Sequence, residues 1–259
     1  MKPAASAAVT PPRTFPWWQP ELGADERDAV GRVVDGNYIN EGEVTAEFER
    51  RLAALFGARH GVATTSGTSA IFLALAAVGV GPGDDVIVPD VTFIASANAV
   101  TLTGARPILV DIDAATLALD CDAFERAITP RTKAVVPVHV SGRAAPMARV
   151  LDIAKRRGIA VVEDAAEALL SKHDGRFLGT FGAAGCFSFS PNKTITTGQG
   201  GLVVTDDDTL AVRLRELKDQ GRPVRGTGGN DVHAVLGFNF KLTNLQAAVG
   251  LGQLAQLDR

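Results

Sequence analysis

The chain has 259 residues, of which 46% are hydrophobic and 21% charged, and is long enough to bury a large core. Its 26 lysines and arginines and 29 aspartates and glutamates leave a net charge of −3, which gives no overall positive field to attract nucleic acid or an anionic membrane. The longest apolar stretch, Ala70 to Val80, is too short to cross a bilayer, so we interpret it as a buried helix.

Cysteine and histidine usage argues against a metal centre. Cys121 and Cys186 are far apart in the sequence and lack metal-ligand spacing, and the four histidines are scattered. We therefore predict no metal site and expect the protein to work in a reduced cytoplasm.

The first part of the chain is predicted to be a tail followed by helices. Residues 1–14 include an alanine- and proline-rich stretch without a leucine-rich centre, which predicts a disordered tail rather than a secretion signal. Asp25 to Val34 and Val44 to Phe56 are predicted helices, and Gly57 stands where a left-handed cap ends the second one. We predict one domain over residues 15–259.

From His60 onward, nearly continuous apolar runs alternate with helical stretches. The predicted strands cover residues 61–63, 86–88, 107–110, 134–138 and 159–162, and the predicted helices cover residues 70–78, 94–102, 122–128 and 147–157. This alternation is typical of βαβ units. We therefore predict an α/β fold of three layers, in which helices cover both faces of a mainly parallel sheet.

The pattern changes after Asp164. Residues 185–189 and 201–204 are predicted strands joined only by a loop, and spaced leucines predict helices over residues 210–217 and 242–258, the second still running as the chain ends. Gly221 to Asn230 is a glycine-rich polar loop that we expect to be mobile. The stretch from Gly79 to Gly83 precedes a strand and contains proline, so we interpret it as a turn rather than a dinucleotide-binding loop.

In open α/β sheets, ligands bind at the carboxyl ends of the strands, so polar residues that follow apolar runs are candidates for a site. Thr64 to Ser69 follows a predicted strand and opens the next helix, which provides hydroxyls and unpaired N–H groups that suit a phosphate. The alternative is that these residues only cap the helix. The segment alone does not decide between the two.

Two more candidates follow predicted strands. Asp164 ends an apolar run, and a carboxylate there could keep a pyridine nitrogen protonated; its alternative role is a helix cap. Phe93 could stack its ring on a cofactor ring, although most phenylalanines belong to the core.

Lys193 has the strongest case for chemistry. Lysines usually lie in solvent, but this one follows the largely apolar Cys186 to Phe189 and precedes the glycine-bearing turn of Gly198 to Gly201. A lysine bonds an aldehyde only when its amine is unprotonated, a state that burial near electropositive groups favours. Pyridoxal 5'-phosphate (PLP) is the usual aldehyde. It needs a lysine, an acid for its ring nitrogen and a polar nest for its phosphate, and the chain offers a candidate for each.

Several motifs, taken in order, carry a family resemblance. They are Ser66-Gly67-Thr68-Ser69-Ala70, Thr92-Phe93, Glu163-Asp164-Ala165-Ala166-Glu167, Phe187-Ser188-Phe189 with Asn192-Lys193, Gly198-Gln199-Gly200-Gly201 and Gly237-Phe238-Asn239-Phe240-Lys241-Leu242-Thr243-Asn244. From about Trp17 to Arg259 the chain resembles the DegT/DnrJ/EryC1/StrS sugar aminotransferases. The order of these motifs along the chain is more specific than any single motif.

The resemblance implies a fold-type-I PLP enzyme, usually a homodimer, that aminates a keto group on a nucleotide-linked deoxysugar. By resemblance, Lys193 is the Schiff-base lysine, Asp164 the partner of the pyridine nitrogen and Phe93 the stacking ring. The family pattern also places Gly67, Thr68, Ser69 and Ser188 at the phosphate, Glu167 near the ring hydroxyl and Asn239 at the phosphate of the neighbouring subunit's cofactor.

The implied reaction has two stages. An amino acid, which we take to be glutamate, gives its amino group to the cofactor, and the group then passes to a keto sugar while Lys193 moves the proton. One alternative is a sugar dehydratase that uses the pyridoxamine form, but such relatives carry histidine where this chain has Lys193. The other is a non-catalytic or regulatory protein that kept the fold.

The chain departs from the family pattern at three points. Asn37 to Gly42 resembles a Gly-Trp-Ile-Ser stretch with Tyr38 in place of tryptophan, and Glu167 stands where glutamine or histidine is usual. Family members normally continue into a small carboxyl-terminal domain that helps to close the substrate pocket, and we expect this domain to be absent from the chain. The sequence does not identify the sugar, the carbon aminated or the nucleotide.

Overall fold

The computed structural model describes residues 16, 18–223 and 232–257. Its centre is a seven-stranded sheet with the order β1-β9-β8-β5-β4-β2-β3, and β6 and β7 form a separate two-stranded sheet. The strands are β1 (His60–Thr64), β2 (Asp85–Pro89), β3 (Arg106–Val110), β4 (Thr132–Val135), β5 (Ala160–Asp164), β6 (Lys172–His173), β7 (Arg176–Phe177), β8 (Ala184–Ser188) and β9 (Gly201–Thr205).

Most of the large sheet is parallel. The neighbours β8, β5, β4, β2 and β3 run in one direction, and β9 runs antiparallel to both β8 and β1. β1 therefore points the same way as the parallel strands, and their carboxyl ends share one edge of the sheet. The predicted pair of strands without an intervening helix is confirmed as β8 and β9.

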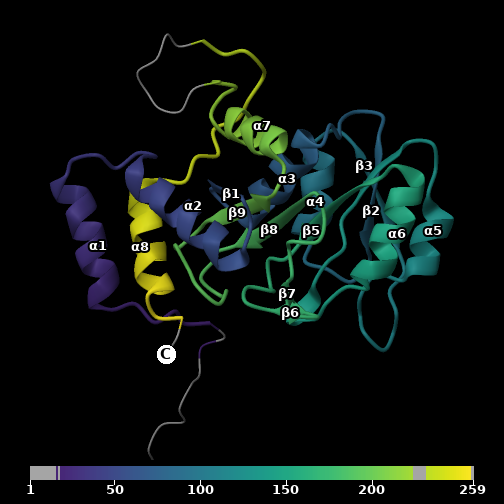
Figure 1. The fold of residues 1–259 in the computed structure, drawn as a ribbon, viewed down its shortest axis with the longest axis horizontal. Coiled ribbons are helices and arrows are strands. Elements are labelled where there is room, and N and C mark those ends of the chain that lie inside the picture. The colour runs from purple at the N-terminus through teal and green to yellow at the C-terminus, as the bar shows by residue number, and fades with distance from the viewer. Residues whose placement is uncertain (1–15, 17, 224–231, 258–259) are drawn as a thin grey trace, which may run out of the picture.

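Helices cover both faces of the sheet. The α-helices of the described chain are α1 (Ala24–Asp35), α2 (Glu43–Phe56), α3 (Gly67–Ala77), α4 (Ala95–Leu102), α5 (Cys121–Ala127), α6 (Met147–Arg157), α7 (Asp208–Lys218) and α8 (Asn244–Leu254). Val62, Val86 and Val162 pack with α3, α4 and α7 on one face. On the other face, Ala63 packs with α2 and α8, and Val161 with α5 and α6. The predicted three-layer α/β fold is confirmed (Figure 1).

α1 lies at the margin of the molecule. It packs against α8 through Ala29, Val33 and Ala248, and Figure 1 shows the two helices side by side at one end of the sheet. The predicted left-handed cap of α2 is confirmed, because Gly57 has φ 67°.

Some predicted bounds were wrong. α8 ends at Leu254 and residues 255–257 form a turn, so the last helix does not continue to residue 258 as predicted. The strand predicted over residues 134–138 ends at Val135, since Pro137 has no N–H to continue the ladder. Neither the β6–β7 hairpin nor the 3-10 turn Val140–Gly142 was predicted. The predicted tail of residues 1–14 and most of the loop predicted to be mobile lie outside the described residues.

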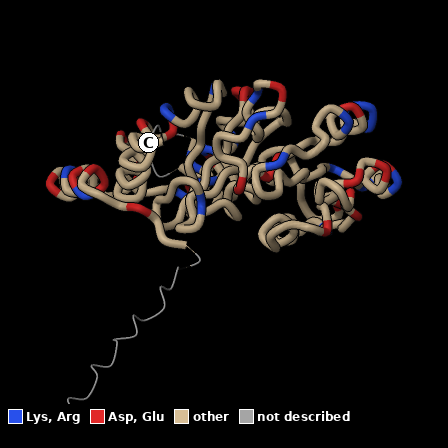
Figure 2. The backbone as a smooth tube through the Cα atoms, turned by 90° about the horizontal axis from the view of Figure 1, so that it is seen from below, with Lys and Arg blue, Asp and Glu red and all other residues tan. Residues whose placement is uncertain are grey.

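Charged residues of both signs are distributed over the chain (Figure 2). α1 illustrates the mixture, with Asp25 and Glu26 in its first turn and Arg32 in its last. Within the described ranges, no helix has the length and apolar character needed to cross a membrane, and no group of three or more His, Cys, Asp or Glu side chains could hold a metal ion.

Candidate functional site

Asp164 stands at the carboxyl end of β5 with only 5% of its surface exposed. Its Oδ2 accepts a hydrogen bond from Ser96 Oγ at 2.6 Å, and its Oδ1 accepts one from the Ala166 N–H at 3.1 Å. Burial raises the pKa of the Asp164 carboxyl, while Ser96, the Ala166 N–H and the charge of Lys193 act in the opposite direction. No helix of the described chain begins at Asp164, so its alternative role as a helix cap is wrong.

Lys193 is carried by the connection between β8 and β9, at the same edge of the sheet. Its side chain is only 17% exposed, and its Nζ lies 3.5 Å from Glu167 Oε1. It is also close enough to Asp164 for its charge to favour the ionised carboxylate. The structure thus places the amine outside bulk water and near both acids that the motifs singled out.

Glu167 links two loops at this edge. Its Oε2 accepts a hydrogen bond from the Ser141 N–H at 2.9 Å, while its Oε1 faces Lys193. Ser141 has φ 51°, a left-handed conformation that serine seldom adopts. This contact orients the carboxylate that replaces the usual glutamine or histidine.

Thr64 to Ser69 forms the turn from β1 into α3, as predicted. Ser66 and Ser69 make a capping box, in which Ser66 Oγ accepts from the Ser69 N–H at 3.1 Å and Ser69 Oγ accepts from the Ser66 N–H at 2.9 Å. The N–H groups of Gly67 and Thr68 and the Thr68 hydroxyl find no partner among the described residues. The serines therefore cap the helix, and the donors left in its first turn are compatible with the predicted phosphate site.

Close backbone approaches hold this turn against the sheet. A Cβ at Gly67 would lie 2.8 Å from Ser188 Cβ, and a Cβ at Gly201 would lie 2.2 Å from the Ser66 carbonyl oxygen. Ser188 Oγ in turn lies 3.2 Å from Ser190 Oγ, and Ser190 O accepts from the Lys193 N–H at 3.0 Å. The predicted phosphate residues and the lysine loop are thus adjacent.

Phe93 precedes α4 and is 73% exposed, so the alternative that it is a core residue is wrong. Its carbonyl oxygen accepts a hydrogen bond from the Ser96 N–H at 3.1 Å, which fixes the turn that carries it. The ring is thus largely exposed in the turn that leads into α4.

Asn239 is exposed and is not brought together with Asp164 and Lys193 in the chain. Its neighbours Phe238 and Phe240 stack at 5.7 Å between ring centroids, and both make edge contacts with Phe72. The segment is fixed to the end of α7, because the Phe240 N–H donates to Lys218 O at 2.9 Å. Two partly buried phenylalanines that pack against the core thus flank the exposed Asn239.

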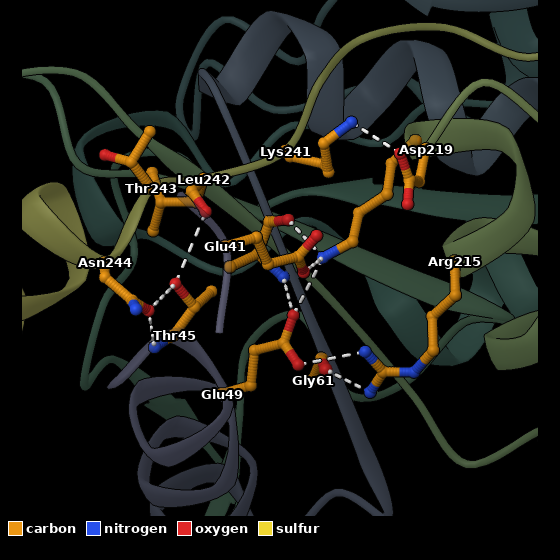
Figure 3. Close-up of polar contacts among 12 residues, drawn as sticks. Glu41, Thr45, Glu49, Gly61, Arg215, Asp219, Lys241, Leu242, Thr243 and Asn244 are labelled. Carbon is orange, nitrogen blue, oxygen red and sulfur yellow. Dashed lines mark hydrogen bonds and ion pairs between the residues drawn. The ribbon is translucent and has the colours of Figure 1, made fainter. Parts of the chain in front are cut away.

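A buried ion cluster supports this segment (Figure 3). Lys218 is 1% exposed, and its Nζ lies 2.6 Å from Glu41 Oε1 and 3.0 Å from Glu49 Oε1. Arg215 Nη1 lies 2.9 Å from Glu49 Oε2, and Ala63 O accepts from Lys218 Nζ at 3.0 Å. This Lys218 cluster joins α7 to α2, to the segment before α2 and to β1. Sequence reasoning missed it, because a charged helix face is normally solvated.

The segment that resembles Gly-Trp-Ile-Ser is fixed by the start of α8. Asn244 Oδ1 accepts from the Thr45 N–H at 3.0 Å (Figure 3). Asn244 Nδ2 donates to Tyr38 O at 3.1 Å. The Asn244 N–H also donates to Asn40 O at 3.1 Å. Tyr38 itself is half-exposed.

Sequence reasoning also missed a buried histidine beside Asp164. His139 Nδ1 accepts from the Ala145 N–H at 3.1 Å, so the ring hydrogen lies on Nε2, which donates to Glu163 Oε2 at 2.9 Å. Its backbone N–H donates to Asp164 O at 3.0 Å. Because Glu163 and Asp164 are consecutive in a strand, they face opposite sides, and only Asp164 faces the lysine.

The carboxyl edge therefore gathers a buried acid, a shielded amine, an exposed aromatic ring and unpaired N–H groups at the start of a helix. A mainly parallel sheet with helices on both faces and this edge is the architecture of the fold-type-I aminotransferases. The chain belongs to the DegT/DnrJ/EryC1/StrS aminotransferase family, whose pattern it matches over residues 20–259.

Individual relatives agree with this assignment. The chain is 46% identical to GDP-perosamine synthase of Caulobacter vibrioides over 92% of its own length and 64% of the relative's. The crystal structure of S. venezuelae DesV in complex with a ketimine intermediate is 41% identical with a TM-score of 0.85, over 90% of this chain and 62% of that one. Bacillus subtilis NtdA with bound cofactor PMP is 36% identical with a TM-score of 0.84, over 90% and 52%. The chain thus spans less than two thirds of the length of these relatives.

Proposed function

We propose that the chain is the cofactor-binding part of a PLP-dependent aminotransferase that converts a nucleotide-linked keto-deoxysugar to an amino sugar. The amine donor in this proposal is an amino acid, glutamate. The observation that carries it is that buried Asp164 and the shielded amine of Lys193 lie at the same sheet edge, near enough for the lysine charge to lower the pKa of the acid.

The residues fit PLP. The buried Asp164 carboxylate has a raised pKa and gains from a cation such as a protonated pyridine nitrogen. The unpaired N–H groups of Gly67 and Thr68 suit a phosphate dianion at the start of α3. The exposed Phe93 ring offers a flat face for stacking.

When bound, PLP supplies an aldehyde that bonds amines and a ring that withdraws electrons from the adjoining carbon. Lys193 would hold its carbonyl carbon, Asp164 its ring nitrogen, and Gly67, Thr68, Ser69 and Ser188 its phosphate, with Glu167 near the ring hydroxyl. With PLP bound, the Lys193 amine would move a proton between the substrate carbon and the cofactor carbon. Glu167, 3.5 Å from that amine, stabilises it while it carries the proton.

The substrate class follows from the relatives. GDP-perosamine synthase, 46% identical, is named for an amino sugar carried on a nucleotide. We extend a nucleotide-sugar substrate to this chain, in the biosynthesis of polysaccharides, including lipopolysaccharide, or of secondary-metabolite sugars.

We also propose a homodimer, in which Asn239 reaches the phosphate site of the neighbouring subunit. Its exposure between two partly buried phenylalanines supports this role, because an exposed amide is accessible to a second subunit. A cytoplasmic location agrees with two cysteines that are buried and free.

The test replaces Lys193 by alanine and follows the visible absorbance of protein incubated with PLP. Wild type is expected to develop a band that borohydride removes, and Lys193→Ala is expected to lack it. Lys155→Ala, at an exposed lysine in the last turn of α6, is the matched control and keeps the band. A borohydride-sensitive band that persists in Lys193→Ala refutes the assignment.

A second measurement separates an aminotransferase from a binding protein. Glutamate added to PLP-loaded wild type is expected to convert the cofactor to its pyridoxamine form. Protein that holds PLP on Lys193 but leaves it unchanged with every amino donor supports the non-catalytic alternative.

A further inference from the structure

Ser96 joins two of the predicted cofactor contacts, although no motif singled it out. It lies in the first turn of α4 and is fully buried. Its Oγ is 2.6 Å from Asp164 Oδ2, 2.7 Å from Thr92 Oγ1 and 3.4 Å from Phe93 O. One hydroxyl therefore touches the acid proposed for the ring nitrogen and the turn that carries the proposed stacking ring.

The direction of the hydrogen bonds follows from donor chemistry. An ionised Asp164 carboxylate only accepts, so the Ser96 proton points to Asp164 Oδ2. Ser96 Oγ then accepts from the Thr92 hydroxyl, whose other nearby acceptor, Phe93 O, lies farther away at 3.3 Å. The chain of donors runs from Thr92 through Ser96 to Asp164.

Both oxygens of Asp164 are thereby restrained. Oδ2 is held by Ser96 and Oδ1 by the Ala166 N–H, so the plane of the carboxylate has little freedom to turn. The Ser96 N–H also donates to Phe93 O at 3.1 Å, so the same residue fixes the Phe93 turn through its backbone. A shift of α4 would move the acid and the ring together.

We propose that Ser96, supported by Thr92, is a positioning residue for the transfer reaction, because it orients the Asp164 carboxylate and ties it to the turn that carries Phe93. The inference rests on the proposed function and adds residues that act through Asp164 instead of touching the cofactor. A merely structural Ser96 would satisfy a buried carboxylate without affecting what binds beside it.

The test uses the full chain, with PLP as the probe, and the variants Ser96→Ala and Ser96→Cys. A hydrogen bond to a charged group is worth enough that Ser96→Ala is expected to weaken PLP binding about tenfold or more. Cysteine has a similar size and is a weak donor, so Ser96→Cys is expected to fall between alanine and wild type. Because cysteine fills the space of the serine side chain, Ser96→Cys tests the loss of the hydroxyl without leaving a cavity.

The pH dependence of the spectrum supplies a readout that a structural role does not move. In Ser96→Ala the Asp164 carboxylate is less well oriented, so it holds the proton on the ring nitrogen less firmly and the ring withdraws less electron density. The pH at which the two absorbance bands of the bound cofactor interconvert is therefore expected to rise. The other titratable groups around the site are unchanged in every variant: His139, Glu163, Glu167, Cys186 and Lys193.

Thr103→Val is the matched control. Thr103 ends the same helix, and its Oγ1 donates to Val100 O at 2.7 Å, so the variant removes a hydroxyl from α4 far from Asp164. It is expected to keep wild-type PLP affinity and the wild-type pH midpoint. If wild type binds PLP on Lys193 but Ser96→Ala keeps the wild-type PLP affinity and pH midpoint, the role of Ser96 is refuted and the proposed function is not. Wild type that takes up no PLP overturns the proposed function and this inference with it.

Discussion

Replacing Lys218 by methionine tests the buried ion cluster that supports the Asn239 segment. The change keeps an apolar stem of similar length but removes the cation whose Nζ lies 2.6 Å from Glu41 Oε1 and 3.0 Å from Glu49 Oε1. Glu49 keeps Arg215 at 2.9 Å, yet the cluster goes from two cations and two carboxylates to one cation and two carboxylates. The excess negative charge lies where Lys218 is 1% exposed, so water does not screen it.

Removal of one partner from a buried ion pair costs about 3–5 kcal/mol. For a chain of this size each kcal/mol lowers the melting temperature by about 2–4 °C, so we expect a fall of roughly 6–20 °C. The assay is thermal unfolding followed by circular dichroism in the absence of cofactor. Neutralising a carboxylate in the double variant Lys218→Met/Glu41→Gln is expected to recover part of the loss.

The control is Arg149→Met, which removes the cation of an exposed pair with Asp122. The side chains of that pair are 54% and 61% exposed, and exposed pairs contribute about 0–1 kcal/mol. If Lys218→Met and Arg149→Met lower the melting temperature equally, or the double variant recovers nothing, the reasoning from buried charge is wrong.

Three further changes probe the site. Gly67→Ala places a Cβ 2.8 Å from Ser188 Cβ, so overpacking is expected to destabilise the protein by about 1–3 kcal/mol and to weaken PLP binding. A variant with the melting temperature and the PLP affinity of wild type would contradict this close approach. Phe93→Ala removes a ring that is 73% exposed, so stability without cofactor should change by less than about 0.5 kcal/mol while PLP affinity falls several-fold. A large loss of stability with unchanged PLP affinity would show that the ring supports the fold instead of the cofactor. Asp164 has a pKa raised by burial, so the folded state binds the proton more tightly and stability falls as pH rises from the ordinary aspartate range through the raised pKa. Asp164→Asn removes this pH-dependent loss of stability, so the melting temperature of the cofactor-free variant at neutral pH should equal or exceed that of wild type, while PLP binding weakens. A lower melting temperature in the variant would contradict the conclusion that the ionised Asp164 destabilises the fold.

Much of the fold was predictable from the sequence, because burial on both faces leaves a direct pattern. Val86 and Ile87 are consecutive residues of β2, yet they pack into opposite cores, which explains why the strand reads as a continuous apolar run. The end of α8 was not predictable from leucine spacing, since Leu257 lies beyond the last helical turn but still packs against the core.

The chemistry-bearing residues of the site could be found because each follows a strand. Asp164, Phe93 and Thr68 all stand at the carboxyl edge, where topology concentrates polar groups. Ser96 and His139 could not be found this way, since their roles depend on contacts with Asp164 and Glu163 that are remote in sequence.

Lys218 and Asp164 are both buried charged residues, but they are compensated differently, and the contrast bears on function. Lys218 has two carboxylates within 3.0 Å and a carbonyl acceptor, so its charge is balanced within the described chain. Asp164 has hydrogen bonds from Ser96 and the Ala166 N–H but no cation within ion-pair distance among the described residues, and burial keeps its pKa raised. Leaving the buried Asp164 carboxylate with neutral donors only costs stability at this position. That arrangement favours a cationic ligand group at Asp164, which is what a protonated pyridine nitrogen would supply.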